Sequence, residues 1–130
     1  FGGAGTLAVC SMVTASLKRI RRVKTCGYSG LMLPVLEDTG LAARAEEGAY
    51  SIQDLLLYSA VCGLGLDCVP VAGDAPIEAL GGLLLDVAAL AYRKPGPLTA
   101  RIFPVAGKVA GERTSFSHPF LCNSVVLPLS

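Results

Sequence analysis

The sequence predicts an α/β fold built from strand–helix units, with helices packed outside a sheet. Short apolar runs bounded by proline and glycine alternate with longer segments whose apolar residues recur at helical spacing. Three of the strand-like runs end in similar sequences, LPVLED (33–38), VPVAGD (69–74) and FPVAGK (103–108). These sequences start 36 and 34 residues apart, which is the length of one strand–helix unit.

The amino-acid composition indicates that this chain packs against another part of its protein or against another chain. Of the 130 residues, 52% are hydrophobic and 16% are charged, so the chain is more apolar and less charged than a typical independent domain. We therefore expect residues 1–130 to form a single α/β unit that is a fragment of a longer protein. Its apolar face would pack against the remainder of the same protein or another chain, and we expect a homo-oligomer.

Charge and cysteine content exclude several classes of function. A net charge of +1 argues against nonspecific nucleic-acid binding, and no apolar run approaches the ~20 residues of a membrane span. The five cysteines include no Cys-x-x-Cys pair and are accompanied by a single histidine, which argues against a metal site. Free thiols in a reducing cytoplasm fit this pattern best, and the cofactor, if any, is unknown.

Local signals define the expected elements. Helices are predicted over residues 7–22, 38–47, 51–62 and 74–93. The second starts at Asp38-Thr39, the third at a capping box of Ser51 with Asp54, and the fourth at the cap residue Asp74. Extended segments are predicted over 23–35, 66–71, 98–104 and 120–127. Gly81 and Gly82 lie inside the last helix, where each costs about 1 kcal/mol relative to alanine. We therefore expect another backbone to approach the helix closely there.

The strand ends predict a small-molecule site. In α/β folds, ligands bind beyond the carboxyl ends of parallel strands. Those ends carry four polar residues that we expect to bind a ligand, Glu37, Asp38, Asp74 and Lys108. Punctuation of loops by proline and glycine is the alternative explanation of the repeated sequences.

The sequence CGLGLD (62–67) places a thiol beside two glycines and a carboxylate. We expect Cys62, Asp67 and Arg101 to be catalytic, and Gly63 and Gly65 to contact the ligand. A helix carboxyl end disfavours a thiolate, so the alternative is that Cys62 is a buried structural cysteine.

Two other classes of function stay open. One is a non-catalytic assembly or scaffold module that buries an apolar face against another chain. The other is phosphate binding at the glycine-rich start of the first helix, Gly2–Thr6, assisted by Arg21 and Arg22. Five of the eleven basic residues lie within 18–24, which indicates either a solvated helix end or a contact with phosphate or an acidic partner.

Long stretches of the chain resemble a known family. GYSGLMLPVLED (27–38), YSIQDLLLYSAVCGLGLDCVPVAGD (50–74), DVAALA (86–91) and PLTARIFPVAGKVAG (97–111) are similar to the carboxy-terminal part of domain-of-unknown-function family 711. This family is also called uncharacterised protein family 0210, and its members are several-fold longer. The resemblance covers essentially the whole chain but implies no known activity.

The resemblance also implies a fold similar to the α/β barrel of pyruvate formate-lyase-type glycyl radical enzymes. Those enzymes use a cysteine on a loop inside the barrel and a glycine radical near the carboxyl terminus. Cys62 is the position that could correspond to the cysteine. The Arg-Val-x-Gly-Tyr-type sequence around the radical glycine is absent from this chain.

Overall fold

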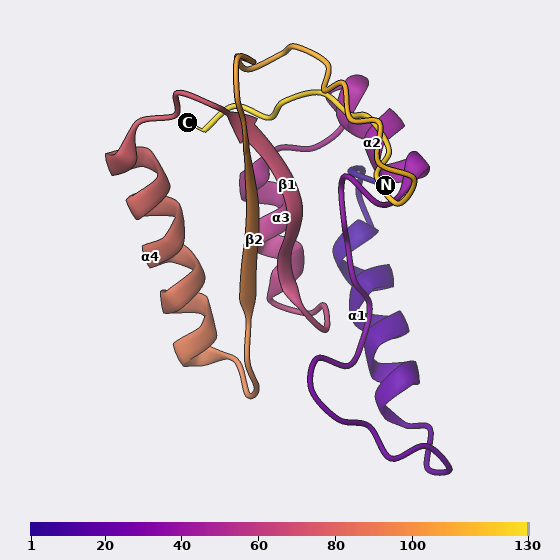
Figure 1. Ribbon diagram of the computed structural model, residues 1–130. Coiled ribbons are helices and arrows are strands. Elements are labelled where there is room, and N and C mark those ends of the chain that lie inside the picture. The colour runs from indigo at the N-terminus through magenta and orange to yellow at the C-terminus, as the bar shows by residue number, and fades with distance from the viewer. Residues whose placement is uncertain (130) are drawn as a thin grey trace.

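The computed structural model describes residues 1–129, and it confirms the α/β class (Figure 1). In chain order the elements are α1 (Thr6–Lys18), α2 (Thr39–Glu46), α3 (Ile52–Ser59), β1 (Gly65–Ala72), α4 (Ile77–Arg93) and β2 (Thr99–Val105). Helices α1 and α4 stand on opposite sides of the two strands, and the segment after β2 runs back over the carboxyl ends of the strands.

The two strands are parallel neighbours joined by α4, the strand–helix–strand arrangement that parallel pairing requires. A third segment extends the sheet on the other side of β1, where Pro34 forms a parallel bridge with Asp67 and the Val35 amide donates to the Asp67 carbonyl at 3.2 Å. The segments that carry the three proline–valine sequences are therefore neighbours in the sheet, with their prolines offset in register. Closure of this sheet into a barrel stays a prediction.

Local capping sets the starts of α2 and α3 as predicted. The Asp38 side chain accepts a hydrogen bond from the Leu41 amide at 2.8 Å at the start of α2. Ser51 and Asp54 form a reciprocal capping box at the start of α3. Both helices are short, and burial of their apolar faces in the core stabilises them.

Three predicted elements differ in the structure. Helix α1 ends at Lys18, and most of the segment predicted as a strand over 23–35 is an exposed loop. Cations repel one another within 18–24, and Gly27 and Gly30 adopt positive φ angles of 63° and 139°, which interrupt extended structure. Helix α4 starts at Ile77 with Pro76 as its cap residue, so Asp74 does not cap it.

The prediction of a strand over residues 120–127 is also wrong. Within 120–127 the structure has one isolated antiparallel bridge, between Val125 and Arg113. The Val126 amide donates to Glu112 and the Leu127 amide donates to Pro70, so consecutive amides bond to different segments. These bonds satisfy the backbone without forming a ladder.

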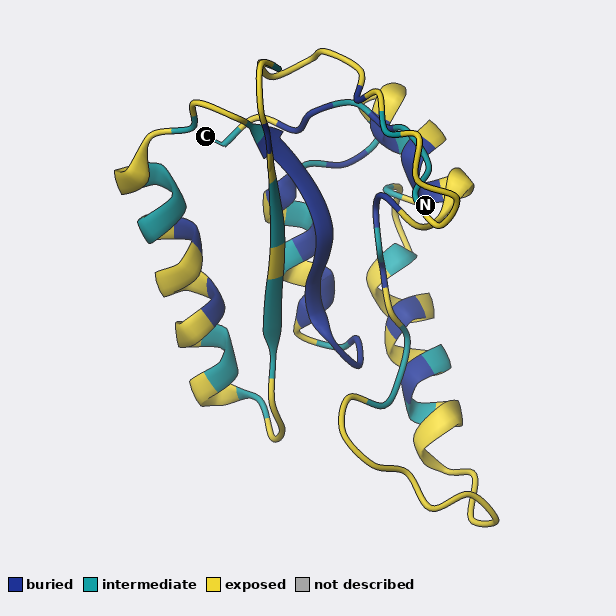
Figure 2. Cartoon of the chain, viewed as in Figure 1, coloured by how far each residue is buried: buried dark blue, intermediate teal, exposed yellow. Residues whose placement is uncertain are grey.

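Burial is concentrated in β1 and decreases outward (Figure 2). Helix α4 buries only Leu83 and Val87, while Ile77, Leu85 and Tyr92 are 82%, 72% and 90% exposed. No described atom lies within 4 Å of a side chain built on Gly81 or Gly82, so the expected close approach is not made within residues 1–129. None of the helices in this part of the chain is long and apolar enough to cross a membrane.

Candidate functional site

A bulge interrupts the pairing of β1 with β2. Leu66 pairs with Ala100 and Val69 pairs with Ile102, so two residues of β1, Asp67 and Cys68, lie opposite Arg101 alone. Bulges of this kind redirect side chains and recur beside active sites. Cys68 has a φ of +48°, the one positive φ of a non-glycine residue among residues 1–129. Such a left-handed conformation costs about 1–2 kcal/mol for an L-residue, so the surrounding contacts must hold it in place.

The bulge holds a buried ion pair. The Asp67 side chain is 1% exposed, and its Oδ1 accepts a hydrogen bond from Nε of Arg101. This hydrogen bond, together with the neighbouring carboxylates, raises the pKa of Arg101, although burial acts in the opposite direction. The second carboxylate oxygen, Oδ2 of Asp67, is buried and has no hydrogen-bond partner. An unpaired buried acceptor costs about 1–3 kcal/mol.

Glu37 completes the cluster from the neighbouring parallel segment. Its Oε1 accepts from the Cys68 thiol at 3.1 Å and lies 3.4 Å from Nη2 of Arg101. Burial, the hydrogen bond to Glu37 and the charge of Asp67 together raise the pKa of the Cys68 thiol to about 12, with Arg101 opposing. Cys68 is therefore a neutral hydrogen-bond donor near pH 7 and not a thiolate nucleophile.

We call Glu37, Asp67, Cys68 and Arg101 the bulge site. With a neutral thiol, two carboxylates and one guanidinium, it carries a formal charge of −1. The side chains of Glu37 and Arg101 are 37% and 49% exposed, while Asp67 and Cys68 lie beneath them. The site therefore presents a carboxylate and a guanidinium to solvent above a buried polar floor.

The structure brings three predicted residues together here, Glu37, Asp67 and Arg101, and adds Cys68, which the sequence did not indicate. Cysteine is rarely found at positive φ, so no local signal marked it. The two residues that flank it, Asp67 and Val69, belong to a strand that was predicted from its apolar character.

Cys62 lies apart from this cluster, in the turn between α3 and β1. It is 0% exposed, and its sulfur accepts a hydrogen bond from the Gly65 amide at 3.3 Å. Gly63 packs against Gly30, and a Cβ on Gly63 would lie 2.5 Å from the Gly30 Cα. Gly65 has a φ of +121°, and a Cβ there would collide with the Thr99 carbonyl. The roles predicted for Cys62, Gly63 and Gly65 in catalysis or binding stay predictions.

The other predicted ligand-binding residues lie at the carboxyl ends of the strands. Asp38 uses its side chain to cap α2. The loops that carry Asp74 and Lys108 meet, because the Gly73 amide donates to the Lys108 carbonyl at 3.1 Å. Within residues 1–129 the Asp74 and Lys108 side chains form no ion pair with each other. Their role in binding also stays a prediction.

No group of three or more histidine, cysteine or acidic side chains in the described chain is arranged to hold a metal ion. All five cysteines are free, and Cys26 is the exposed one. The chemistry available at the bulge site is therefore proton exchange at a carboxylate and hydrogen bonding from a guanidinium and a thiol.

The parallel strand–helix–strand unit defines an α/β protein. A family model described as "Uncharacterised ACR (DUF711)" matches residues 1–117, and the chain belongs to this family. A UPF0210 protein of Syntrophobacter fumaroxidans is 35% identical over 132 residues, covering 99% of this chain and 29% of the relative. A UPF0210 protein of Lactobacillus helveticus is 34% identical over 123 residues, covering 92% of this chain and 27% of the relative.

The chain thus spans less than a third of the length of these curated relatives. No solved structure matches it. The activity, substrates and partners of the whole protein are therefore proposals.

Proposed function

We propose that the chain supplies an enzyme with part of a small-molecule site at the bulge site, and that the ligand carries both a carboxylate and an ammonium group. Arg101 binds the carboxylate, and Glu37 binds the ammonium above the buried charge of Asp67. The single observation that carries the proposal is the strained bulge, which holds a buried carboxylate with a free Oδ2 beneath a half-exposed guanidinium.

The donor count of Arg101 supports the carboxylate contact. A guanidinium has five N–H donors, of which Asp67 takes the one on Nε and Glu37 lies near Nη2. The remaining donors are available at a side chain that is 49% exposed. A planar guanidinium binds carboxylates through two parallel hydrogen bonds, and Asp67 holds it in place for that purpose.

The charge of the site supports the ammonium contact. A ligand with only an anionic group would meet a site of formal charge −1, which is unfavourable. A zwitterion places its cationic group beside the carboxylates and its anionic group on Arg101, so both attractions are realised. Glu37 is the exposed carboxylate and is the group that can exchange a proton with the bound molecule.

The catalytic role predicted for Cys62 would require the turn between α3 and β1 to open, because its sulfur is buried. Cys68 acts in the proposed site as a neutral donor that orients Glu37. The proposal therefore assigns binding to Arg101, proton exchange to Glu37 and positioning to Asp67 and Cys68.

The test is a thermal-shift and calorimetric comparison of α-amino acids with the corresponding α-hydroxy acids and amines on the intact protein. We expect compounds with both groups to bind, and Arg101→Gln to weaken this binding at least about tenfold. Arg113→Gln is the matched control, since Arg113 forms an exposed pair with Glu46 outside the site. Amino-acid binding that is unaffected by Arg101→Gln, or the absence of any binding, would contradict the proposal.

A second candidate function is assembly, and the exposed face of α4 favours it. Ile77, Leu85 and Tyr92 offer apolar side chains to solvent, and β2 has one edge without a strand partner within residues 1–129. Unpaired strand edges and large apolar patches are typical of interfaces. We propose that this face packs against the remainder of a longer chain or against a second copy in a homo-oligomer.

Leu85→Glu tests the assembly proposal, with the adjacent exposed Asp86→Lys as control. If the face is covered in the intact protein, Leu85→Glu lowers the unfolding free energy by about 1.5–3 kcal/mol or dissociates the oligomer in sedimentation measurements. Equal and negligible effects of the two variants would show that the face is free.

A further inference from the structure

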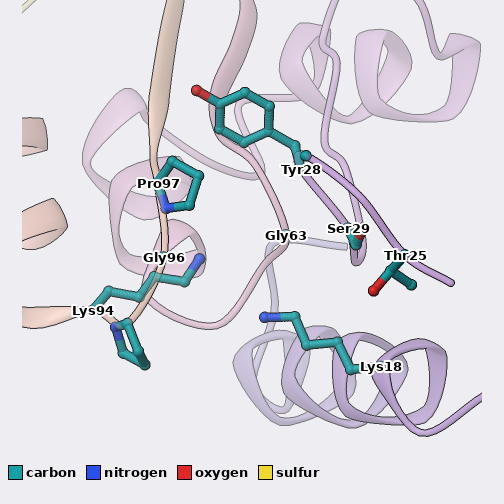
Figure 3. Close-up of a pocket in the computed structure, with 10 residues that line it drawn as sticks. Lys18, Thr25, Tyr28, Ser29, Gly63, Lys94, Gly96 and Pro97 are labelled. Carbon is teal, nitrogen blue, oxygen red and sulfur yellow. The ribbon is translucent and has the colours of Figure 1, made fainter.

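A polar pocket of about 320 Å³ lies at the amino ends of the strands, apart from the bulge site (Figure 3). Its walls come from the basic end of α1, the loop after it, Gly63 before β1, and the turn between α4 and β2. Lys18 and Lys94 enter it from different elements, and Figure 3 shows their side-chain amines pointing toward each other.

Lys94 is fixed in this pocket by the end of α3. Its Nζ donates to the Ser59 carbonyl at 3.2 Å and to the Cys62 carbonyl, which are acceptors left free by the helix end. An ammonium has three donors, so one remains for a ligand. The lysine is thus held in a defined position without an acidic partner.

The two lysines are unfavourable neighbours when the pocket holds no anion. Burial lowers the pKa of Lys94, and the charge of Lys18 lowers it further, while Cys62 acts in the opposite direction. No acidic residue lines the pocket in the described chain. Apart from Gly63, the lining residues lie in two stretches of sequence, 1–36 and 87–111, that contain no aspartate or glutamate.

Neighbouring groups reinforce the positive potential. The run 18–24 contains five basic residues, and none of them forms an ion pair within residues 1–129. The Thr25 hydroxyl also lines the pocket and has no hydrogen-bond partner in the same part of the chain. A cluster of cations, of which Lys94 is held in place, together with an unpaired hydroxyl is complementary to a compact dianion.

We propose that this pocket binds a phosphate group between the amines of Lys18 and Lys94, with the Thr25 hydroxyl as a further donor. The ligand is inorganic phosphate or a phosphate monoester. This site differs from the glycine-rich start of α1, where the Gly2 amide donates to the Thr6 hydroxyl and the adjoining groove is mostly apolar. It is also independent of the bulge site.

The test uses calorimetric titration of the intact protein with inorganic phosphate and with glycerol phosphate at constant ionic strength. Lys18→Gln is expected to weaken binding about tenfold. Lys24→Gln is the matched control, because it removes the same charge from the same basic run but does not line the pocket. We expect the control to change affinity less than about twofold.

Lys18→Arg keeps the cation and is expected to retain most of the affinity. Tighter binding of glycerol phosphate would identify a monoester as the ligand, and equal binding would identify free phosphate. The proposal is overturned if neither phosphate compound binds saturably. It is also overturned if Lys18→Gln and Lys24→Gln weaken binding equally, since that result means a diffuse basic surface and no site.

Discussion

Replacing Arg101 by methionine tests whether the bulge site depends on the buried ion pair. The variant keeps the length and apolar stem of the side chain but removes the donor to Asp67, whose side chain is 1% exposed. Removing one partner of a fully buried pair costs about 3–5 kcal/mol. Because the Arg101 side chain is 49% exposed, water can reach part of the pair, and we expect about 2–3 kcal/mol.

A double variant separates the unpaired charge from lost packing. In Arg101→Met, the Asp67 carboxylate has no partner for either oxygen, because Oδ2 is already unpaired. Adding Asp67→Asn removes the buried charge while keeping the shape of the side chain. We therefore expect the double variant to recover about 1–2 kcal/mol of the loss.

The assay is urea unfolding at equilibrium, followed by far-ultraviolet circular dichroism because the chain has no tryptophan. Arg113→Met is the control, since the pair of Arg113 with Glu46 at 3.3 Å is largely exposed and is worth about 0–1 kcal/mol. A loss for Arg101→Met no larger than for Arg113→Met would refute the reasoning. So would a double variant that is less stable than Arg101→Met alone.

Further predictions concern backbone contacts and thiol reactivity. Gly63→Ala should lower the free energy of unfolding by about 1–3 kcal/mol, because its Cβ would lie 2.5 Å from the Gly30 Cα. Gly81→Ala, in a helix with open space around it, should raise stability by about 0.5–1 kcal/mol, and the opposite order of the two variants would contradict the structure. Iodoacetamide at pH 8 should alkylate the exposed Cys26 and leave Cys68 unmodified in peptide mass spectra, because Cys68 is buried and its pKa is about 12. Modification of both thiols at the same rate in the folded protein would count against the assigned environment of Cys68.

Features decided by neighbours in sequence could be predicted. The caps at Asp38 and at Ser51 with Asp54 act within one helical turn, so the starts of α2 and α3 follow from local residues alone. Strand β1 was also predictable, because only a fully buried strand accommodates so apolar a run between glycines.

Features decided by distant segments could not be predicted. Apolar character around Val126 indicated a strand, but whether a ladder forms depends on which segments meet it. Gly81 and Gly82 indicated a close approach, and the part of the chain described here places nothing against them. Residues 1–129 also leave the apolar side of α4 uncovered, so these two observations concern the same helix.

The register of the sheet explains why Asp67 and Arg101 meet although 34 positions separate them. At Leu66 and Ala100 the paired residue numbers also differ by 34, the spacing between the second and third proline–valine sequences. At Val69 and Ile102 the difference is 33, so one residue has been added to β1 between these pairs.

The pairing before the bulge therefore aligns Asp67 with Arg101, and Cys68 is the additional residue. After the bulge the proline–valine sequences are offset by one residue, so Pro70 pairs with Phe103. Adding a residue to a strand reverses the sides to which the following side chains point unless the backbone compensates. The left-handed φ of Cys68 provides that compensation, so Leu66 and Val69 both remain in the core. The strain at Cys68 and the burial of the Asp67 carboxylate are thus two consequences of one insertion. A chain selected only for stability would have little reason to keep both, which is why we place the functional site there and not at the more conspicuous Cys62.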